Sequence, residues 1–220
     1  MKLIKKILRT NIVWRLTGLT YPSAVVATNG YYLSKRELIE VGKEENRTLI
    51  KFLDKEKTLL EFGSGIGKNL FAIADKIKVG YGLDVNSLYC KLASRLAGRY
   101  NIHNVNFIHY DGKVFPKLPQ FNIIYENGVF ERIPKNLVKS YVTILKNIFL
   151  QDQGIMILYF LSENSKNTDF TKRLGDDAYV FWNKLEIEKL VNDLELMVVE
   201  IQEWPMAYVY ALKNKVVGLS

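Results

Sequence analysis

Short apolar runs alternate with amphipathic segments along most of the chain. Apolar runs bounded by turn residues predict strands, and apolar positions that recur every three or four residues predict helices. Because strands that alternate with helices form parallel sheets with right-handed crossovers, the pattern predicts an α/β fold closed by an antiparallel pair. Strands are expected at 58–62, 79–84, 104–109, 121–126, 155–161, 195–203 and 206–213, and helices at 67–77, 87–99, 134–150 and 183–193.

The chain before the first strand follows a different pattern. Residues 1–16 have apolar positions at helical spacing with basic residues mostly opposite them, which predicts an amphipathic helix. Residues 20–33 contain Tyr-Pro and Asn-Gly pairs typical of loops and turns. Ser34 and Glu37 form a capping-box pattern, so a helix is expected from there to about Asp54. We therefore divide the chain into a basic arm and loop at 1–36 and a main domain at 37–220.

A turn with glycines at alternate positions follows the first strand, at Gly63, Gly65 and Gly67. The dinucleotide fingerprint needs its third glycine at position 68, where this chain has lysine, so NAD is not the expected ligand. A phosphate-binding P-loop needs serine or threonine where this chain has Asn69. What remains is an acid, Glu61, two residues before Gly-x-Gly-x-Gly, at a strand end where open α/β sheets bind nucleotide-like ligands.

The segment Glu61–Gly67 resembles motif I of the class I S-adenosylmethionine (SAM)-dependent methyltransferases. Asp84 ends the second apolar run, Asp111 follows the third, and 121–133 resembles the family's fourth-strand segment, so the similarity covers about 57–161. The resemblance implies a Rossmann-like, mainly parallel seven-stranded sheet with a C-terminal antiparallel hairpin and helices on both faces. It also implies a small-molecule-type methyltransferase that uses SAM and releases S-adenosylhomocysteine (SAH).

The resemblance further implies that the loop within 1–36 is a lid over the active site, and it implies roles for individual residues. Glu61, Gly63 and Gly65 border the methionine part of the cofactor, Asp84 accepts hydrogen bonds from the ribose hydroxyls, and Asp111 reads the adenine amino group. Val85 and Tyr110 are candidates to cover the faces of the adenine ring, although either residue could equally belong to the core of its strand. The expected cofactor-binding set is Glu61, Gly63, Ser64, Gly65, Asp84, Val85, Tyr110, Asp111, Gly112 and Glu126.

No catalytic base can be assigned from the sequence. Tyr125 and Glu126, at the tip of the fourth strand, are the nearest polar candidates. Arg132 stands where small-molecule members of the family often have histidine, and it either holds an anionic substrate group through its guanidinium fork or is simply solvated. No cluster of residues has metal-ligand spacing, so no metal is expected.

The single cysteine and the distribution of charge bear on the cellular compartment of the protein and on its binding partners. Cys90 is the only cysteine, which excludes an internal disulfide and favours a reducing, cytoplasmic compartment. The net charge is +8, yet residues 1–36 hold seven basic residues and no acid, so the rest is nearly neutral. That distribution argues against a nucleic-acid substrate. The arm either packs against protein or makes peripheral contact with an anionic membrane through residues 1–16.

The acceptor is expected to be an O or N nucleophile of a small molecule, a glycan or a lipid-linked compound. The fourth strand is followed by Tyr125-Glu126-Asn127-Gly128 rather than the Asn/Asp-Pro-Pro-aromatic tetrapeptide that marks amino groups of nucleic acids or proteins. Two alternatives stay open: an RNA or protein methyltransferase that docks through its basic arm, and a non-catalytic SAM-binding partner subunit.

Overall fold

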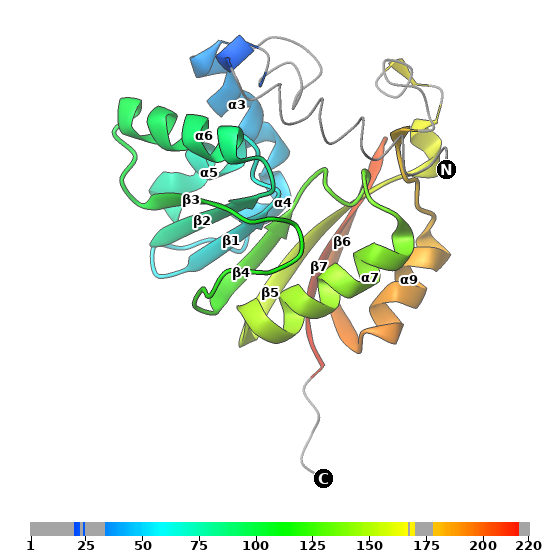
Figure 1. Ribbon diagram of the computed structural model, residues 1–220. Coiled ribbons are helices and arrows are strands. Elements are labelled where there is room, and N and C mark those ends of the chain that lie inside the picture. Colours follow the sequence, from blue (N-terminus) through cyan, green and yellow to red (C-terminus); the bar gives the residue numbers. More distant parts are fainter. Residues whose placement is uncertain (1–19, 23, 25–33, 167, 170–177, 216–220) are drawn as a thin grey trace. The chain divides into compact units, whose positions relative to one another are not determined.

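The computed structural model describes residues 20–22, 24, 34–166, 168–169 and 178–215 (Figure 1). The predicted amphipathic helix at 1–16 and most of the predicted lid loop lie outside these residues. The division of the chain at residue 36 therefore stays a prediction. The chain forms two compact units, 1–56 with 63–117 and 57–62 with 118–220.

The predicted strands are all present, and their bounds agree with the sequence pattern to within one residue except in the fifth. They are hydrogen-bonded in the order β3-β2-β1-β4-β5-β7-β6, with the last two pairings antiparallel. The predicted seven-stranded, mainly parallel sheet with a C-terminal antiparallel hairpin is thus confirmed. The strands are β1 (Thr58–Phe62), β2 (Val79–Asp84), β3 (Val105–His109), β4 (Phe121–Glu126), β5 (Leu150–Leu161), β6 (Leu196–Trp204) and β7 (Ala207–Asn214).

In the first unit, α3, α5 and α6 gather on one side of β2 and β3 (Figure 1). The glycine turn that resembles motif I also belongs to this unit, and it would rest on β2. The glycines of β2 permit close packing of the elements that cover it. A Cβ atom on Gly80 would lie 2.8 Å from Leu70 of α5. The helices are α3 (Lys35–Glu45), α4 (Arg47–Ile50), α5 (Lys68–Ile73), the 3-10 turn η1 (Ala74–Lys76) and α6 (Ser87–Arg99).

The capping box is confirmed, but the single helix predicted up to Asp54 is not. Glu37 N–H donates to Ser34 Oγ (3.3 Å), and Ser34 N–H donates to Glu37 Oε2 (2.8 Å). The helix is interrupted at Asn46, whose buried side-chain amide donates to the Asn69 carbonyl (3.2 Å). This long-range hydrogen bond, invisible in the local apolar pattern, ties the break between α3 and α4 to α5.

In the second unit, α7 and α9 lie side by side and are joined by ion pairs (Figure 1). Lys135 Nζ is 2.5 Å from Glu186 Oε1, and Lys139 Nζ is 2.8 Å from Asp193 Oδ2. The predicted helix at 134–150 is confirmed as α7 and a π-helical turn. The helices are α7 (Lys135–Ile144), η2 (Leu145–Phe149), η3 (Glu163–Ser165) and α9 (Lys184–Asp193).

The predicted turn at 151–154 is wrong, because β5 begins at Leu150 rather than at Ile155. In the parallel pairing with β4, Phe121 is opposite Leu150 and Ile123 is opposite Ile155. The four intervening residues of β5 are therefore accommodated by a register shift opposite Asn122. The Asn122 side-chain amide donates to Gln151 Oε1 (2.6 Å), which satisfies polar groups at the irregularity.

Candidate functional site

The glycine turn leaves β1 and folds over the end of β2 in the first unit. Gly63 N–H donates to the Leu83 carbonyl at 2.7 Å. Gly63 and Gly67 have φ angles of 78° and 86°, in the left-handed region that disfavours side chains. Gly67 is the N-cap of α5, so the helix begins where the sequence predicts it.

Asp84 connects this turn to the end of β2. Its Oδ2 accepts a hydrogen bond from Gly65 N–H at 2.8 Å, and its Oδ1 accepts one from Asn86 N–H at 2.7 Å. Burial raises the pKa of Asp84, while these two backbone N–H groups act in the opposite direction. The carboxylate is thus fixed between the loop and the first turn of α6.

The remaining residues predicted near the adenine lie beside Asp84. Tyr110 N–H donates to the Asp84 carbonyl at 3.1 Å, and a Cβ atom on Gly112 would lie 3.6 Å from Val85 Cγ1. Val85 is 50% exposed, as a wall for a ligand ring requires, whereas Tyr110 is buried against Phe115 with ring centroids 5.1 Å apart. The structure therefore brings the predicted residues at 84–85 and 110–112 together.

Asp111 is fixed by its own turn. Its Oδ1 accepts hydrogen bonds from Lys113 N–H and Val114 N–H, both at 2.8 Å. These bonds hold the pKa of Asp111 below its ordinary value. The residue is exposed and stays ionised at neutral pH, as a hydrogen-bond acceptor for an amino group must be.

The chemistry of Asp84 fits the ribose of SAM. A carboxylate has about four lone-pair sites. The backbone N–H groups of Gly65 and Asn86 each donate to one oxygen of Asp84, and a backbone hydrogen bond from Val85 acts on the same carboxylate. An ionised carboxylate only accepts hydrogen bonds, so its remaining acceptor capacity would suit a hydroxyl of a vicinal diol. This is the role that the family resemblance implies.

Ser64 and Gly67 face β2 and β3. A Cβ atom on Gly82 would lie 2.5 Å from Ser64 Oγ, and one on Gly67 would lie 2.5 Å from the Phe107 ring. Ser64 Oγ is buried and has no hydrogen-bond partner among the described residues. We infer that the loop would contact a ligand through its backbone, while these two positions hold the loop on the sheet.

Glu61, Tyr125 and Glu126 belong to the second unit and are all buried there. Glu61 of β1 is the register partner of Tyr125 in β4. Tyr125 Oη accepts a hydrogen bond from the Asn127 side-chain amide at 3.1 Å. Their catalytic or cofactor roles stay predictions.

Glu126 is tied to three backbone N–H groups. Its Oε1 accepts from Val129 (2.7 Å) and Phe130 (3.1 Å), and its Oε2 accepts from Tyr159 of β5 (3.3 Å). Complete burial raises the pKa of Glu126 to about 8, although these hydrogen bonds oppose the shift. The arrangement indicates that Glu126 shapes the segment that follows β4 by binding its backbone.

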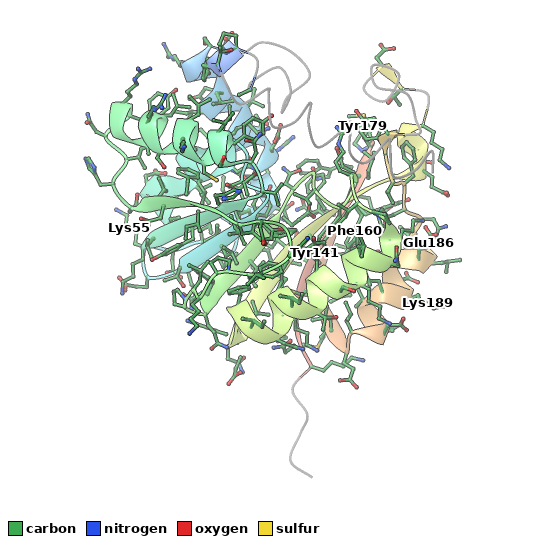
Figure 2. All side chains as sticks on the ribbon, viewed as in Figure 1. Lys55, Tyr141, Phe160, Tyr179, Glu186 and Lys189 are labelled. Atoms are coloured by element: carbon green, nitrogen blue, oxygen red, sulfur yellow. The ribbon has the colours of Figure 1, made fainter. Side chains whose placement is uncertain are left out.

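Arg132 is held by a residue that the sequence did not single out. Its guanidinium lies 4.0 Å from the centroid of the Tyr179 ring, and its Nε is 3.3 Å from Glu131 Oε1. Val180 N–H donates to the Glu131 carbonyl at 2.8 Å, which joins the segment after β4 to the segment before α9. Figure 2 labels Tyr179 in this unit. The Arg132 side chain stays 25% exposed, so it is not a fully solvated arginine.

Asn86 is the second functional residue that sequence reasoning missed. Its backbone N–H fixes Asp84, and its side chain caps α6 by accepting from Leu88 N–H and Tyr89 N–H at 3.0 and 3.4 Å. The sequence did contain a signal for this role, because an asparagine that stands just before a helix is a typical cap, and this one follows the strand-end acid by two residues. For Tyr179 there was no such signal, because it lies far along the chain from Arg132.

The described residues contain neither a metal-binding cluster nor a membrane-spanning helix. No group of three or more histidine, cysteine, aspartate or glutamate residues there could hold a metal ion. None of the helices in the described part of the chain is both long enough and apolar enough to cross a membrane.

The fold matches those of many solved structures. Magnesium protoporphyrin IX methyltransferase ChlM from Synechocystis PCC 6803, with bound SAH, gives a TM-score of 0.69 at 13% identity over 93% of this chain and 99% of that chain. The CcbJ methyltransferase from Streptomyces caelestis gives 0.69 at 12% identity, covering 90% and 99%. An S-adenosylmethionine-dependent methyltransferase from Clostridium acetobutylicum gives 0.63 at 11% identity, covering 86% and 94%.

These similarities establish the fold as that of the SAM-dependent methyltransferases. No protein-family model matches the sequence, and no curated protein matches it either.

Proposed function

We propose that this chain is a methyltransferase that takes a methyl group from SAM and transfers it to an O or N nucleophile of a small-molecule, glycan or lipid-linked acceptor. The observation that carries the proposal is the Gly65–Asp84 hydrogen bond of 2.8 Å, which fixes a carboxylate against an alternate-glycine turn. The methyltransferase fold supports it. The acceptor class is inferred only from the segment after β4, which lacks a nucleic-acid or protein amino-group motif.

The residues of the first unit would hold the cofactor. Asp84 would bind the ribose hydroxyls, the exposed Val85 would cover one face of the adenine, and Asp111 would accept a hydrogen bond from its amino group. SAM supplies a methyl group already activated by its sulfonium leaving group. The protein's main task is then to orient a nucleophile and exclude water, and a base is needed only when the nucleophile arrives protonated.

Arg132 is a candidate to bind the methyl acceptor. The Glu131 carboxylate and the Tyr179 ring fix the plane of its guanidinium, and an oriented guanidinium favours a planar carboxylate or a phosphate. This supports an anionic group on the acceptor. No residue is assigned as the base, so a non-catalytic SAM-binding subunit remains the second candidate function.

Isothermal titration tests the proposal. We expect SAM and SAH to bind and NAD not to bind, and we expect Gly65→Val to abolish SAM and SAH binding. Gly65 has a φ of 53°, where a β-branched residue is strained, and its N–H holds the Asp84 carboxylate. Gly98→Val, which places the same side chain in open space on α6, is the matched control and should bind normally.

Normal SAM binding by Gly65→Val with an unchanged circular dichroism spectrum would mean that the turn is not the cofactor site. A methyl-transfer screen over small molecules, glycans, lipid-linked compounds, RNA and protein then identifies the acceptor. SAM binding without transfer to any acceptor class would favour the partner-subunit alternative.

The basic arm at 1–16 is expected to govern location or acceptor capture rather than cofactor binding. It carries five basic residues and no acid, while the glycine turn and its acids all lie after residue 57. Deleting it should leave SAM affinity unchanged. If the arm contacts membranes, the full chain should sediment with anionic vesicles in a salt-sensitive manner and the truncated chain should not.

Sedimentation that is equal with and without the arm would contradict membrane contact. Steeply salt-dependent RNA binding by the full chain alone would instead favour the RNA-docking alternative. An unfolded truncated chain would show that the arm is structural packing.

A further inference from the structure

An open groove runs along the outer edge of the first unit, between α6 and β3. It consists of two cavities, of about 450 and 520 Å³, that share Ser94 and Phe107. Each volume is in the range of small-molecule sites. We call this the α6–β3 groove. The first cavity is lined by Ser87, Cys90, Lys91, Ser94, Arg95, Phe107 and His109.

The first cavity is cationic. Lys91 and Arg95 lie four residues apart on α6, so they share one face of the helix, and His109 faces the same cavity from β3. Among the described residues that line the two cavities, none is acidic. Burial raises the pKa of the Cys90 thiol to about 12, so it stays neutral and does not offset the positive charge.

The donors of this cavity suit a phosphate. A guanidinium and an ammonium are the usual phosphate-binding groups, and the Ser87 hydroxyl adds a neutral donor. The Ser94 hydroxyl donates to the Cys90 carbonyl at 2.9 Å, which leaves its oxygen as an acceptor where the two cavities join. A phosphate carries the charge that Lys91 and Arg95 require, and a neighbouring hydroxyl could donate to Ser94.

The second cavity has a different character. Its lining includes the rings of Tyr81, His103 and Phe107 and contains no lysine, arginine or acidic residue. Aromatic side chains stack on bases of any sequence, and the combination of cations with aromatic rings is typical of sites for single-stranded nucleic acid. A planar base in the second cavity would place its phosphate near the first.

We propose that the α6–β3 groove binds a nucleotide unit, with the phosphate held by Lys91 and Arg95 and the base in the second cavity. The unit comes either from a free nucleotide or from a single-stranded RNA. The groove is distinct from the cofactor turn but adjoins it through β2. His109 is the register partner of Asp84, and Cys90 Sγ lies 3.9 Å from the Asp84 carbonyl oxygen.

The test uses uridine probes on the full-length protein, because uridine lacks the adenine that the SAM site would accept. UMP is titrated calorimetrically, and a fluorescein-labelled octauridine is followed by anisotropy, each without cofactor and with saturating SAH. We expect both probes to bind and SAH not to displace them. Since no SAM is needed, failure of the proposed methyltransferase function would leave this result unaffected.

Charge-removing variants locate the site. Lys91→Gln/Arg95→Gln should weaken binding at least about tenfold, because two charge-assisted contacts are lost. Ser94→Glu, at an exposed position of α6, places a negative charge between the cavities and should weaken binding further, because the charge repels the phosphate. The matched control Lys55→Gln/Lys78→Gln removes two exposed charges from the same unit outside the groove and should bind normally; Lys55 is labelled in Figure 2.

The two sources of nucleotide give different salt dependence. Tighter binding of octauridine than of UMP, with a steeper loss of affinity on adding salt, would identify an RNA strand. Equal affinities per site with a shallow salt dependence would identify a free nucleotide. No binding of either probe to the wild-type protein, equal loss in the control variant, or displacement by SAH would overturn the proposal.

Discussion

Asp84→Ala should weaken SAM binding by about 30-fold, or about 2 kcal/mol, on the scale of hydrogen bonds that involve a charged group. Two effects combine. The variant loses the acceptor for the ribose hydroxyls. It also leaves two backbone N–H groups without this partner, those of Gly65 and Asn86, which lie 2.8 and 2.7 Å from the carboxylate in the wild type. Isothermal titration with SAM and SAH measures the loss.

Two further variants separate ligand binding from folding. Asp84→Asn keeps the side-chain size and one acceptor oxygen, so an intermediate loss is expected. Asp75→Ala removes an exposed acid from the same unit and should bind SAM as the wild type does. Undiminished SAM binding by a folded Asp84→Ala protein would contradict the assignment of this site.

Glu126→Leu should lower the free energy of unfolding by about 3 kcal/mol or more, since each buried donor left without an acceptor costs about 1–3 kcal/mol. The variant removes the carboxylate that three backbone N–H groups share. Urea unfolding followed by circular dichroism gives the value. Glu188→Leu, at an exposed position of α9 in the same unit, is the control and should change stability little. An equal loss in both variants would contradict a structural role for Glu126.

The same residue should make stability depend on pH. Burial raises the Glu126 pKa from 4.5 to about 8, so the folded protein holds this proton more tightly than the unfolded chain does. The stabilising contribution is therefore complete below the unfolded pKa and is lost as pH rises towards the folded value, by at most about 1.4 kcal/mol per pH unit. Glu126→Gln cannot titrate, so its stability relative to the wild type should rise over this range.

Most of the fold could be read from the sequence because its signals are local. Strand β1, strand β2, helix α6 and strand β4 have the bounds that the apolar pattern predicts, since each buries a face through its own periodicity. The capping box at Ser34 placed a helix start correctly, because a cap joins residues only three positions apart. The strand-end positions of Asp84 and Asp111 followed from the same pattern.

Only the tertiary structure decided what these residues contact. Asn46, at the break between α3 and α4, donates its side-chain amide to the Asn69 carbonyl, and residues 151–154 join β5 through a register shift opposite Asn122. No periodicity encodes either event, because both depend on a partner distant in sequence.

The site shows the same division. The sequence identified the glycine turn and its strand-end acids, whose type and spacing carry the chemistry of a nucleotide-like ligand. It could not show that Tyr179 stacks on Arg132 or that Glu126 is wholly buried among backbone donors. Burial and long-range contacts depend on how whole elements pack against one another. That packing buries a polar residue such as Glu126 and gives it a structural role.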